Sequence, residues 1–131
     1  MSASLPTVLI SDDEPMLVAA LSREARRIGL NPVADTNSDV VTLARQLHPA
    51  IILLDVHQRV DGRDLLAKLK SDPETRGLKV VMLSGEEDPY MRHACLQLGA
   101  DDYEVKPFDP LFLQRIALLA RAEMAPLAAA S

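Results

Sequence analysis

The stretch Ile51–Asp55 constrains the fold of this chain more than any other. Four large apolar residues run without a break and end at a carboxylate. A strand that is apolar on both faces has to be covered by protein on both sides, as the central strands of parallel sheets are. Open parallel sheets hold their ligands at the carboxyl ends of their strands. Asp55 is therefore the first candidate functional residue.

Three other predicted strands also end in polar residues. Residues 8–11 lead into Asp12 and Asp13, residues 80–83 into Ser84, and residues 103–105 into Lys106 and Pro107. In a parallel sheet the carboxyl ends of the strands meet at one edge. If these strands are parallel, three carboxylates, a hydroxyl and an ammonium group gather at that edge.

Strand patterns alternate with helical patterns along the chain. Strands are predicted at residues 7–11, 31–35, 50–55, 78–83 and 102–105, each followed by apolar residues at helical spacing. This alternation is typical of an α/β fold, in which helices cover both faces of a parallel sheet. Pro32 places the second strand at an edge, because proline cannot donate a hydrogen bond to a neighbouring strand. We predict a doubly wound five-stranded sheet in the order 2-1-3-4-5, with its switch point between the first and third strands.

Local signals set the expected boundaries. We expect Asn37 or Ser38 to cap the second helix, and Asp109 with Pro110 to begin the fifth. The 131 residues suit a single domain over the whole chain, with a core at about residues 6–122. Residues 123–131 are expected to form a tail or the start of a linker, because the last residues are small and unpatterned.

The composition argues against several classes of protein. A net charge of −5 and a pI of about 5.1 disfavour a nucleic-acid surface, which is normally basic. No apolar run approaches the ~18 residues of a membrane span, and the N-terminus lacks the features of a signal peptide. We therefore expect a cytoplasmic protein that binds neither nucleic acid nor membrane. No phosphate-binding glycine loop, dinucleotide fingerprint, zinc-protease motif or catalytic triad can be recognised in the sequence.

The charges at the predicted sheet edge call for a cation. Asp12, Asp13 and Asp55 bring three negative charges and Lys106 one positive charge, so a divalent cation would balance them. Oxygen ligands without clustered histidine or cysteine favour Mg²⁺. Mg²⁺ usually takes only one or two carboxylates, which leaves one free to act as a nucleophile toward a phosphoryl group. Lys106 and the Ser84 hydroxyl are suitable partners for its oxygens.

Each of these pieces alone has a simpler interpretation. An acidic pair after a strand is most often a helix cap, and a serine or a Lys-Pro pair after a strand usually belongs to a turn. Their joint occurrence at the ends of successive apolar strands favours a functional site.

The sequence resembles the receiver domain of two-component response regulators over residues 6–121. The resemblance rests on Asp12 and Asp13 after the first strand, Asp55 ending the third, Ser84 ending the fourth, Tyr103, and Lys106 with Pro107. The segments 99–103 and 105–108 are especially similar to the family. The resemblance implies a flavodoxin-like fold, as in chemotaxis regulators, and a signalling role without substrate turnover beyond self-phosphorylation and autodephosphorylation.

The resemblance also implies a role for each matched residue. Asp55 would be the phosphoacceptor, and Asp12, Asp13, Asp55 and the backbone carbonyl of His57 would hold Mg²⁺. Ser84 and Lys106 would bind the phosphoryl group, and the Lys106–Pro107 bond would be cis. Aspartyl phosphate would draw Ser84 inward, and the vacated space would let Tyr103 turn inward.

The loop after Asp55 departs from the family pattern. The family commonly has proline four residues after the phosphoacceptor and glycine eight after it. Here Arg59 stands at the fourth place, and Gly62 comes seven residues after Asp55. The loop is thus one residue short, which bears on the position of the His57 carbonyl and on metal affinity.

The implied partners are a histidine kinase or phosphotransfer protein as phosphate donor and a downstream protein or output domain. The latter would bind the face formed by the fourth helix, fifth strand and fifth helix, and a homodimer is a further expectation. One alternative is a receiver-like interaction module that takes no phosphate, which the short loop favours. Another is a phosphohydrolase with Asp55 as nucleophile, although His57 stands where such enzymes have a second aspartate.

Overall fold

The computed structural model describes residues 5–130, with side chains described as far as residue 124. One parallel sheet has the strand order β2-β1-β3-β4-β5, which confirms the predicted topology. The strands are β1 Thr7–Ser11, β2 Asn31–Asp35, β3 Ile51–Asp55, β4 Lys79–Ser84 and β5 Asp102–Val105. The switch point therefore lies between β1 and β3, where Asp12 directly follows β1 and Asp55 ends β3.

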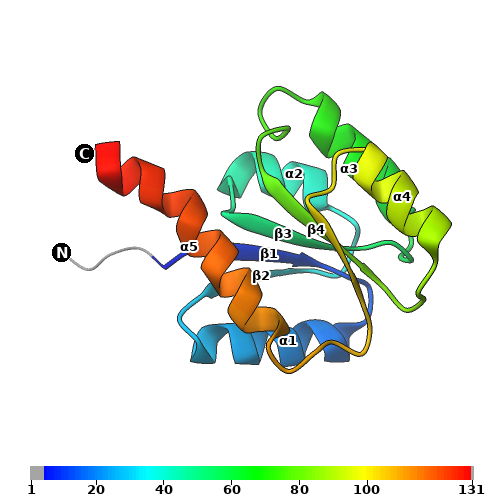
Figure 1. Ribbon diagram of the computed structural model, residues 1–131, viewed down its shortest axis with the longest axis horizontal. Helices are drawn as coiled ribbons and strands as arrows, with labels where there is room; N and C mark the ends of the chain where they lie inside the picture. Colours follow the sequence, from blue (N-terminus) through cyan, green and yellow to red (C-terminus); the bar gives the residue numbers. More distant parts are fainter. Residues whose placement is uncertain (1–4, 131) are drawn as a thin grey trace.

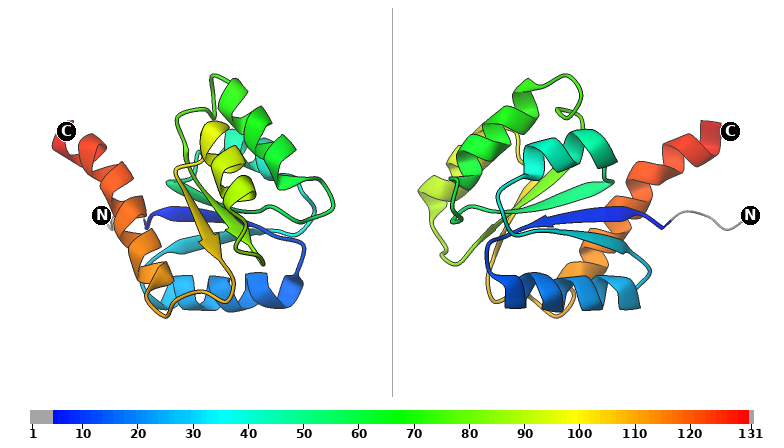
Figure 2. Two further views of the ribbon diagram at one scale, coloured as in Figure 1. Left: turned by 45° about the vertical axis from the view of Figure 1, so that its right-hand side comes forward. Right: turned by 180° about the vertical axis from the view of Figure 1, so that it is seen from behind.

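Helices cover both faces of the sheet (Figures 1 and 2). α1 and α5 pack on one face and α2, α3 and α4 on the other. The helices are α1 Pro15–Arg27, α2 Val40–Leu47, α3 Gly62–Ser71, α4 Pro89–Gln97 and α5 Phe112–Ala130. α5 includes residues 125–130, a segment rich in alanine, the strongest helix former. That residues 123–131 form a tail or the start of a linker stays a prediction.

The two cores follow the pleat of the central strand. Ile51 and Leu53 belong to the cluster under α1 and α5, whereas Ile52 and Leu54 belong to the cluster under α2, α3 and α4. All residues of β3 are buried, as the unbroken apolar run predicts. The carboxylate that ends this strand is consequently held at a fixed place on the sheet edge.

The start of α2 differs from the sequence-based prediction. The N-cap residue is Asp39, without a side-chain cap, rather than Asn37 or Ser38. The buried carboxylate of Asp35 instead accepts the backbone N–H groups of Asn37 and Asp39 at 3.0 and 3.1 Å. Ser38 lies between them with φ 57°, in the left-handed region. A residue at the end of β2 thus holds the loop that leads into α2, and the helix itself has no side-chain cap.

Within residues 5–130, none of the helices is long and apolar enough to cross a lipid bilayer.

Candidate functional site

Three carboxylates gather at the carboxyl edge of the sheet. Asp12 and Asp13 directly follow β1, and Asp55 is the last residue of β3. Each offers one carboxylate oxygen, and these oxygens lie within 4.8 Å of one another. Asp12 and Asp55 are buried, whereas Asp13 is exposed. The fold therefore brings together the acidic residues that were selected from the sequence.

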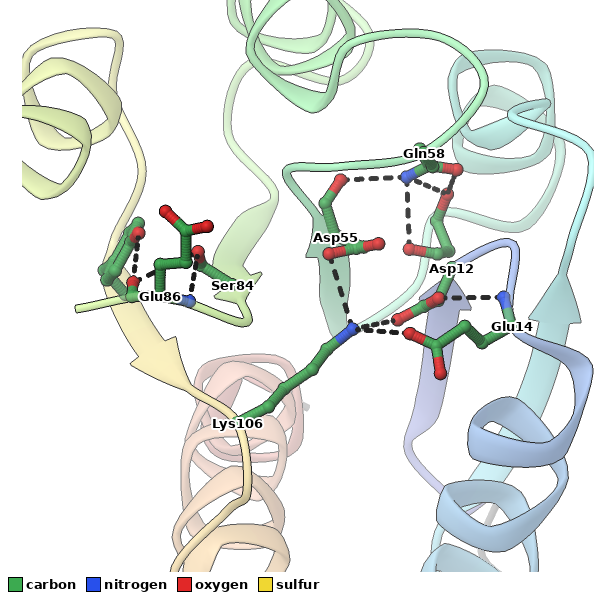
Figure 3. Close-up of polar contacts among 9 residues, drawn as sticks. Asp12, Glu14, Asp55, Gln58, Ser84, Glu86 and Lys106 are labelled. Atoms are coloured by element: carbon green, nitrogen blue, oxygen red, sulfur yellow. Dashed lines mark hydrogen bonds and ion pairs between the residues drawn. The ribbon is translucent and has the colours of Figure 1, made fainter. Parts of the chain in front are cut away.

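Lys106 supplies positive charge to this cluster (Figure 3). Its Nζ lies 2.9 Å from Asp12 Oδ2, 3.5 Å from Asp55 Oδ1 and 3.6 Å from Glu14 Oε1. Burial acts to lower the pKa of Lys106, but the hydrogen bond to Asp12 and the neighbouring carboxylates outweigh it and raise the pKa. The ammonium group therefore stays charged beside the phosphoacceptor candidate.

Asp55 is held in an environment that opposes its charge. Burial is the largest cause that raises the pKa of Asp55, and the charge of Asp12 is the second. Lys106 and the backbone N–H of His57 act in the opposite direction without cancelling these effects, so the pKa rises to about 6. A cation or another group that neutralises Asp55 would relieve this conflict.

Ser84 lies at the same edge, at the end of the strand next to β3. Its hydroxyl accepts the backbone N–H of Glu86 and donates to the Glu86 carbonyl, both at 3.2 Å. Ser84 thus closes a turn in the β4–α4 loop (Figure 3). Its own carbonyl accepts the N–H of Lys106 at 2.7 Å, which places the lysine at the site, and the Lys106–Pro107 bond is cis.

Tyr103 points inward, with only 2% of the residue exposed. Its hydroxyl donates to the carbonyl of Glu86 at 3.2 Å, and burial raises its pKa. Arg92 of α4 lies over the ring, 4.9 Å from its centroid, and donates to the Tyr103 carbonyl at 3.1 Å. The Tyr103 ring therefore points inward while the Ser84 hydroxyl is still hydrogen-bonded to Glu86. We had expected the ring to turn inward only after Ser84 moves.

The loop between β3 and α3, residues 56–61, is closed by a tight contact. The N–H of Gly62 donates to the Val56 carbonyl at 2.8 Å. A Cβ atom at position 62 would lie 2.3 Å from the carbonyl oxygen of Asp55, so only glycine lets α3 begin this close to the strand. His57, whose carbonyl was selected as a metal ligand, lies exposed in this loop.

Gln58 is a site residue that the sequence reasoning missed. Its side chain turns back from the loop to the sheet edge and donates to the Asp55 carbonyl at 3.0 Å (Figure 3). The short loop could have pointed to Gln58. Where a loop lacks one residue of the family pattern, a polar neighbour is a candidate to make the contacts that the absent residue would have made.

The donor set fits a small, hard cation. Among residues 5–124, the cluster that could hold a metal consists of the carboxylates of Asp12, Asp13 and Asp55, without histidine or cysteine side chains. Oxygen ligands of this kind suit Mg²⁺ or Ca²⁺ better than zinc or copper. The Lys106 ammonium lies against two of the three carboxylates and balances part of their charge.

The sequence matches a known family along most of its length. The profile described as response regulator receiver domain matches residues 8–117. The probable transcriptional regulatory protein TcrX of Mycobacterium tuberculosis is 39% identical over 119 residues, which are 88% of this chain and 50% of that protein. The DNA-binding response regulator MtrA of Mycolicibacterium smegmatis is 34% identical over 105 residues, or 79% of this chain and 45% of that protein. The chain thus spans about half the length of these relatives.

Solved structures agree with this assignment. A putative response regulator from Chloroflexus aurantiacus superposes with a TM-score of 0.82 at 26% identity and covers 90% of this chain and 99% of its own. The chemotaxis response regulator CheY4 of Vibrio cholerae has a TM-score of 0.81 at 20% identity, over 89% of this chain and 99% of its own, and shows the shared fold. From the profile match over residues 8–117 and the similarity to the curated relatives, we conclude that the chain belongs to the response regulator receiver domain family of two-component signalling.

Proposed function

We propose that this receiver domain accepts a phosphoryl group on Asp55 and thereby changes a surface that a partner recognises. The observation that supports the proposal most is the environment of the buried Asp55 carboxylate. Two other carboxylates offer oxygens within 4.8 Å, and the Lys106 ammonium lies 3.5 Å away. This arrangement combines a nucleophile with the charges that phosphoryl transfer needs.

The transfer itself would make one bond and break one. An Asp55 carboxylate oxygen attacks the phosphorus of a phosphohistidine, the O–P bond forms as the P–N bond breaks, and the leaving imidazole takes a proton from solvent. Lys106 pairs with a phosphoryl oxygen, because its Nζ already lies between Asp55 and Asp12. The Ser84 hydroxyl donates to another phosphoryl oxygen after its hydrogen bond to the Glu86 carbonyl breaks. The protein contributes positioning and charge neutralisation more than covalent help.

Mg²⁺ is the metal in this proposal. Asp12, Asp13, Asp55 and the backbone carbonyl of His57 would hold it, with water in the remaining positions. When bound, Mg²⁺ neutralises the negative charge that phosphoryl oxygens bring to the cluster. Asp13 suits the role of a direct ligand because it is exposed and can be reached from solvent.

Incubation with acetyl phosphate and Mg²⁺ tests the proposal directly. The parent protein should gain one phosphoryl group by intact mass, and Asp55→Asn should gain none. Asp64→Asn, which changes an exposed aspartate in the first turn of α3, is the matched control and should be labelled like the parent. A parent that takes no label would favour the interaction module without phosphate, and steady turnover of added phosphate esters would favour a phosphohydrolase.

The partners follow from the same proposal. A histidine kinase or phosphotransfer protein in the cytoplasm would donate the phosphate. The output would leave through α4, β5 and α5, because Tyr103 of β5 is tied to α4 by Arg92 and to the loop after Ser84 by its hydroxyl. The relatives TcrX and MtrA are named as transcriptional and DNA-binding regulators, so we propose a transcriptional output, delivered by a downstream domain or protein.

A further inference from the structure

The side chain of Gln58 joins three parts of the sheet edge. Its Nε2 donates to the backbone carbonyl of Asp55 at 3.0 Å and to that of Ser11 at 3.2 Å. Its Oε1 accepts the hydroxyl of Ser38 at 3.0 Å. One amide group therefore connects the end of β3, the end of β1 and the loop between β2 and α2.

The partners fix the orientation of this amide. Two backbone carbonyls can only accept hydrogen bonds, so the NH₂ group has to face them and the oxygen has to face Ser38. The Ser38 hydroxyl in turn accepts the N–H of Val60 at 3.3 Å, within the same loop as Gln58. A glutamate would place an oxygen against the two carbonyls, and a methionine would leave them without this donor.

The network continues into the sheet through a buried pair. The Ser11 hydroxyl donates to Asp35 Oδ2 at 2.8 Å and accepts Gln58 Nε2 at 3.3 Å. Asp35 is 3% exposed and also holds the β2–α2 loop through its other oxygen, which accepts the N–H of Asn37. Gln58 is thus anchored to a buried, hydrogen-bonded part of the molecule.

Two of the three anchored points, Ser11 and Asp55, adjoin the metal site, and so does Gln58 itself. Ser11 immediately precedes Asp12, Asp55 is the proposed phosphoacceptor, and Gln58 itself follows His57. The loop of residues 56–61 is short, and it returns to its starting point, because α3 begins at Gly62 in contact with the Asp55 backbone. A fixed Gln58 consequently limits where the neighbouring His57 carbonyl can lie.

We propose that Gln58 is a positioning residue for the metal site, which holds the His57 carbonyl toward the carboxylates and couples the site to the β2–α2 loop. This inference rests on the proposed metal and phosphoacceptor function. It predicts two effects that mere support of the fold would not produce. Metal affinity of the folded protein depends on Gln58, and the backbone amide of Ser38 responds when metal binds.

The test is a titration with Mg²⁺ followed by NMR on the parent, Gln58→Met and Arg59→Met. Mutation of a residue that orients a metal ligand typically lowers metal affinity by about 10–100-fold, so Gln58→Met should bind Mg²⁺ about tenfold more weakly than the parent. Arg59→Met is the matched control, since Arg59 lies in the same loop and, among the residues whose side chains are described, donates only to the carbonyl of the exposed residue Asn37, at 3.1 Å. It should bind like the parent. In the parent, the Ser38 amide resonance should shift on Mg²⁺ addition, and Gln58→Met should lose this response.

A second variant covers the case in which Gln58→Met does not fold. Ser38→Gly removes the hydroxyl that Gln58 accepts, and glycine suits the φ of 57° at this position. It should weaken Mg²⁺ binding severalfold. Equal Mg²⁺ affinity in the parent and in the folded Gln58 and Ser38 variants would overturn the inference, even if those variants unfold more easily. A parent that binds no Mg²⁺ would overturn both the proposed metal site and this inference, whereas binding that is independent of Gln58 overturns the inference alone.

Discussion

The buried position of Asp55 is unfavourable for a charged carboxylate, and this bears on its proposed role as phosphoacceptor. The residue is 2% exposed and faces the charge of Asp12, and together these effects raise its pKa to about 6. Burial disfavours a free carboxylate, but it favours any state in which the charge is neutralised. A cation or a phosphoryl group with its counter-charges would therefore be stabilised by the same surroundings that disfavour the free Asp55 carboxylate.

Replacing Asp55 with asparagine should stabilise the metal-free domain at neutral pH. The folded protein holds the Asp55 proton up to about pH 6, whereas the unfolded chain releases it near the ordinary value of 3.8. The contribution of Asp55 to the free energy of unfolding therefore falls as pH rises through this window and levels off above it. Asp55→Asn should raise the free energy of unfolding by about 1–3 kcal/mol near pH 7, measured by urea denaturation in the presence of a chelator.

The same comparison in acid is the control for this prediction. Near pH 4 the folded parent carries a protonated, neutral Asp55, so most of the difference between parent and variant should vanish. An equal gain at both pH values would mean that asparagine improves packing or hydrogen bonding, and the raised pKa of Asp55 would not be its cause.

Among the elements, the junction of β3 and α3 is the most tightly constrained. A Cβ at position 62 would meet the Asp55 carbonyl oxygen at 2.3 Å and Val56 Cα at 2.7 Å, and backbone atoms cannot move aside as a side chain can. Gly62→Ala should therefore lower the free energy of unfolding by about 2 kcal/mol or more, the upper range for overpacking. Urea denaturation measures this loss.

Gly77→Ala is the matched control for this change. Its Cβ would meet no heavy atom within 4 Å, so its effect should stay within about 0.5 kcal/mol. If both variants lost similar stability, the close approach of α3 to the end of β3 would not be the reason that position 62 is glycine.

The β4–α4 loop links the proposed phosphoryl site to Tyr103. The Glu86 carbonyl accepts hydrogen bonds from both the Ser84 and the Tyr103 hydroxyls, each at 3.2 Å. A phosphoryl oxygen on Asp55 would compete for the Ser84 hydroxyl and release this turn. In this chain the signal would consequently be a shift of the turn that Tyr103 contacts, rather than the opening of an empty slot for its ring.

Fluorine NMR of protein labelled with 3-fluorotyrosine tests this link. The chain has 2 tyrosines, and Tyr90 is 88% exposed, so it serves as an internal reference. Beryllofluoride, a mimic of the phosphoryl group, should shift the Tyr103 resonance and leave that of Tyr90 nearly unchanged. Ser84→Ala should strongly reduce the shift, because no hydroxyl is left to be drawn away from Glu86. A full shift in Ser84→Ala would show that the signal takes another route.

On the scale of the whole molecule, the topology could be predicted because it depends on strong local patterns. The apolar run of β3 is buried throughout, and Pro32 does lie on the edge strand β2. The residues at the strand ends were selected for the same reason, since a parallel sheet collects them at one edge.

What could not be predicted depends on contacts between distant segments. The loop before α2 is held by Asp35 at the end of β2, and the helix starts after Asp39 without a side-chain cap, so the capping signal of Asn37 and Ser38 was misleading. Gln58 contacts Ser11 and Ser38, which are 47 and 20 residues away, and these contacts exist only once the sheet has its register. The inward-pointing ring of Tyr103 is likewise in contact with Arg92, which reaches it from α4.

The metal should stabilise the domain as a whole, because its proposed ligands come from the segment directly after β1, from the end of β3 and from the loop that follows β3. A ligand that binds only the folded state adds about 1.4 kcal/mol to the free energy of unfolding at ten times its Kd. Asp55, with a pKa of about 6, has to lose its proton to bind. Near pH 5 this competition should weaken binding about tenfold, so the same Mg²⁺ concentration should add only about 0.4 kcal/mol.

Urea unfolding with and without Mg²⁺, near pH 7 and near pH 5, measures this dependence. Asp13→Asn is the control, because it removes an exposed ligand and leaves the buried pair Asp12 and Asp55 in place. It should keep close to the metal-free stability of the parent and lose the Mg²⁺ increment at both pH values. An increment that is equal near pH 5 and pH 7 would mean that Mg²⁺ binds without displacing the Asp55 proton. The metal would then bind elsewhere on the domain, since an oxygen that carries a proton is a poor ligand for a hard cation.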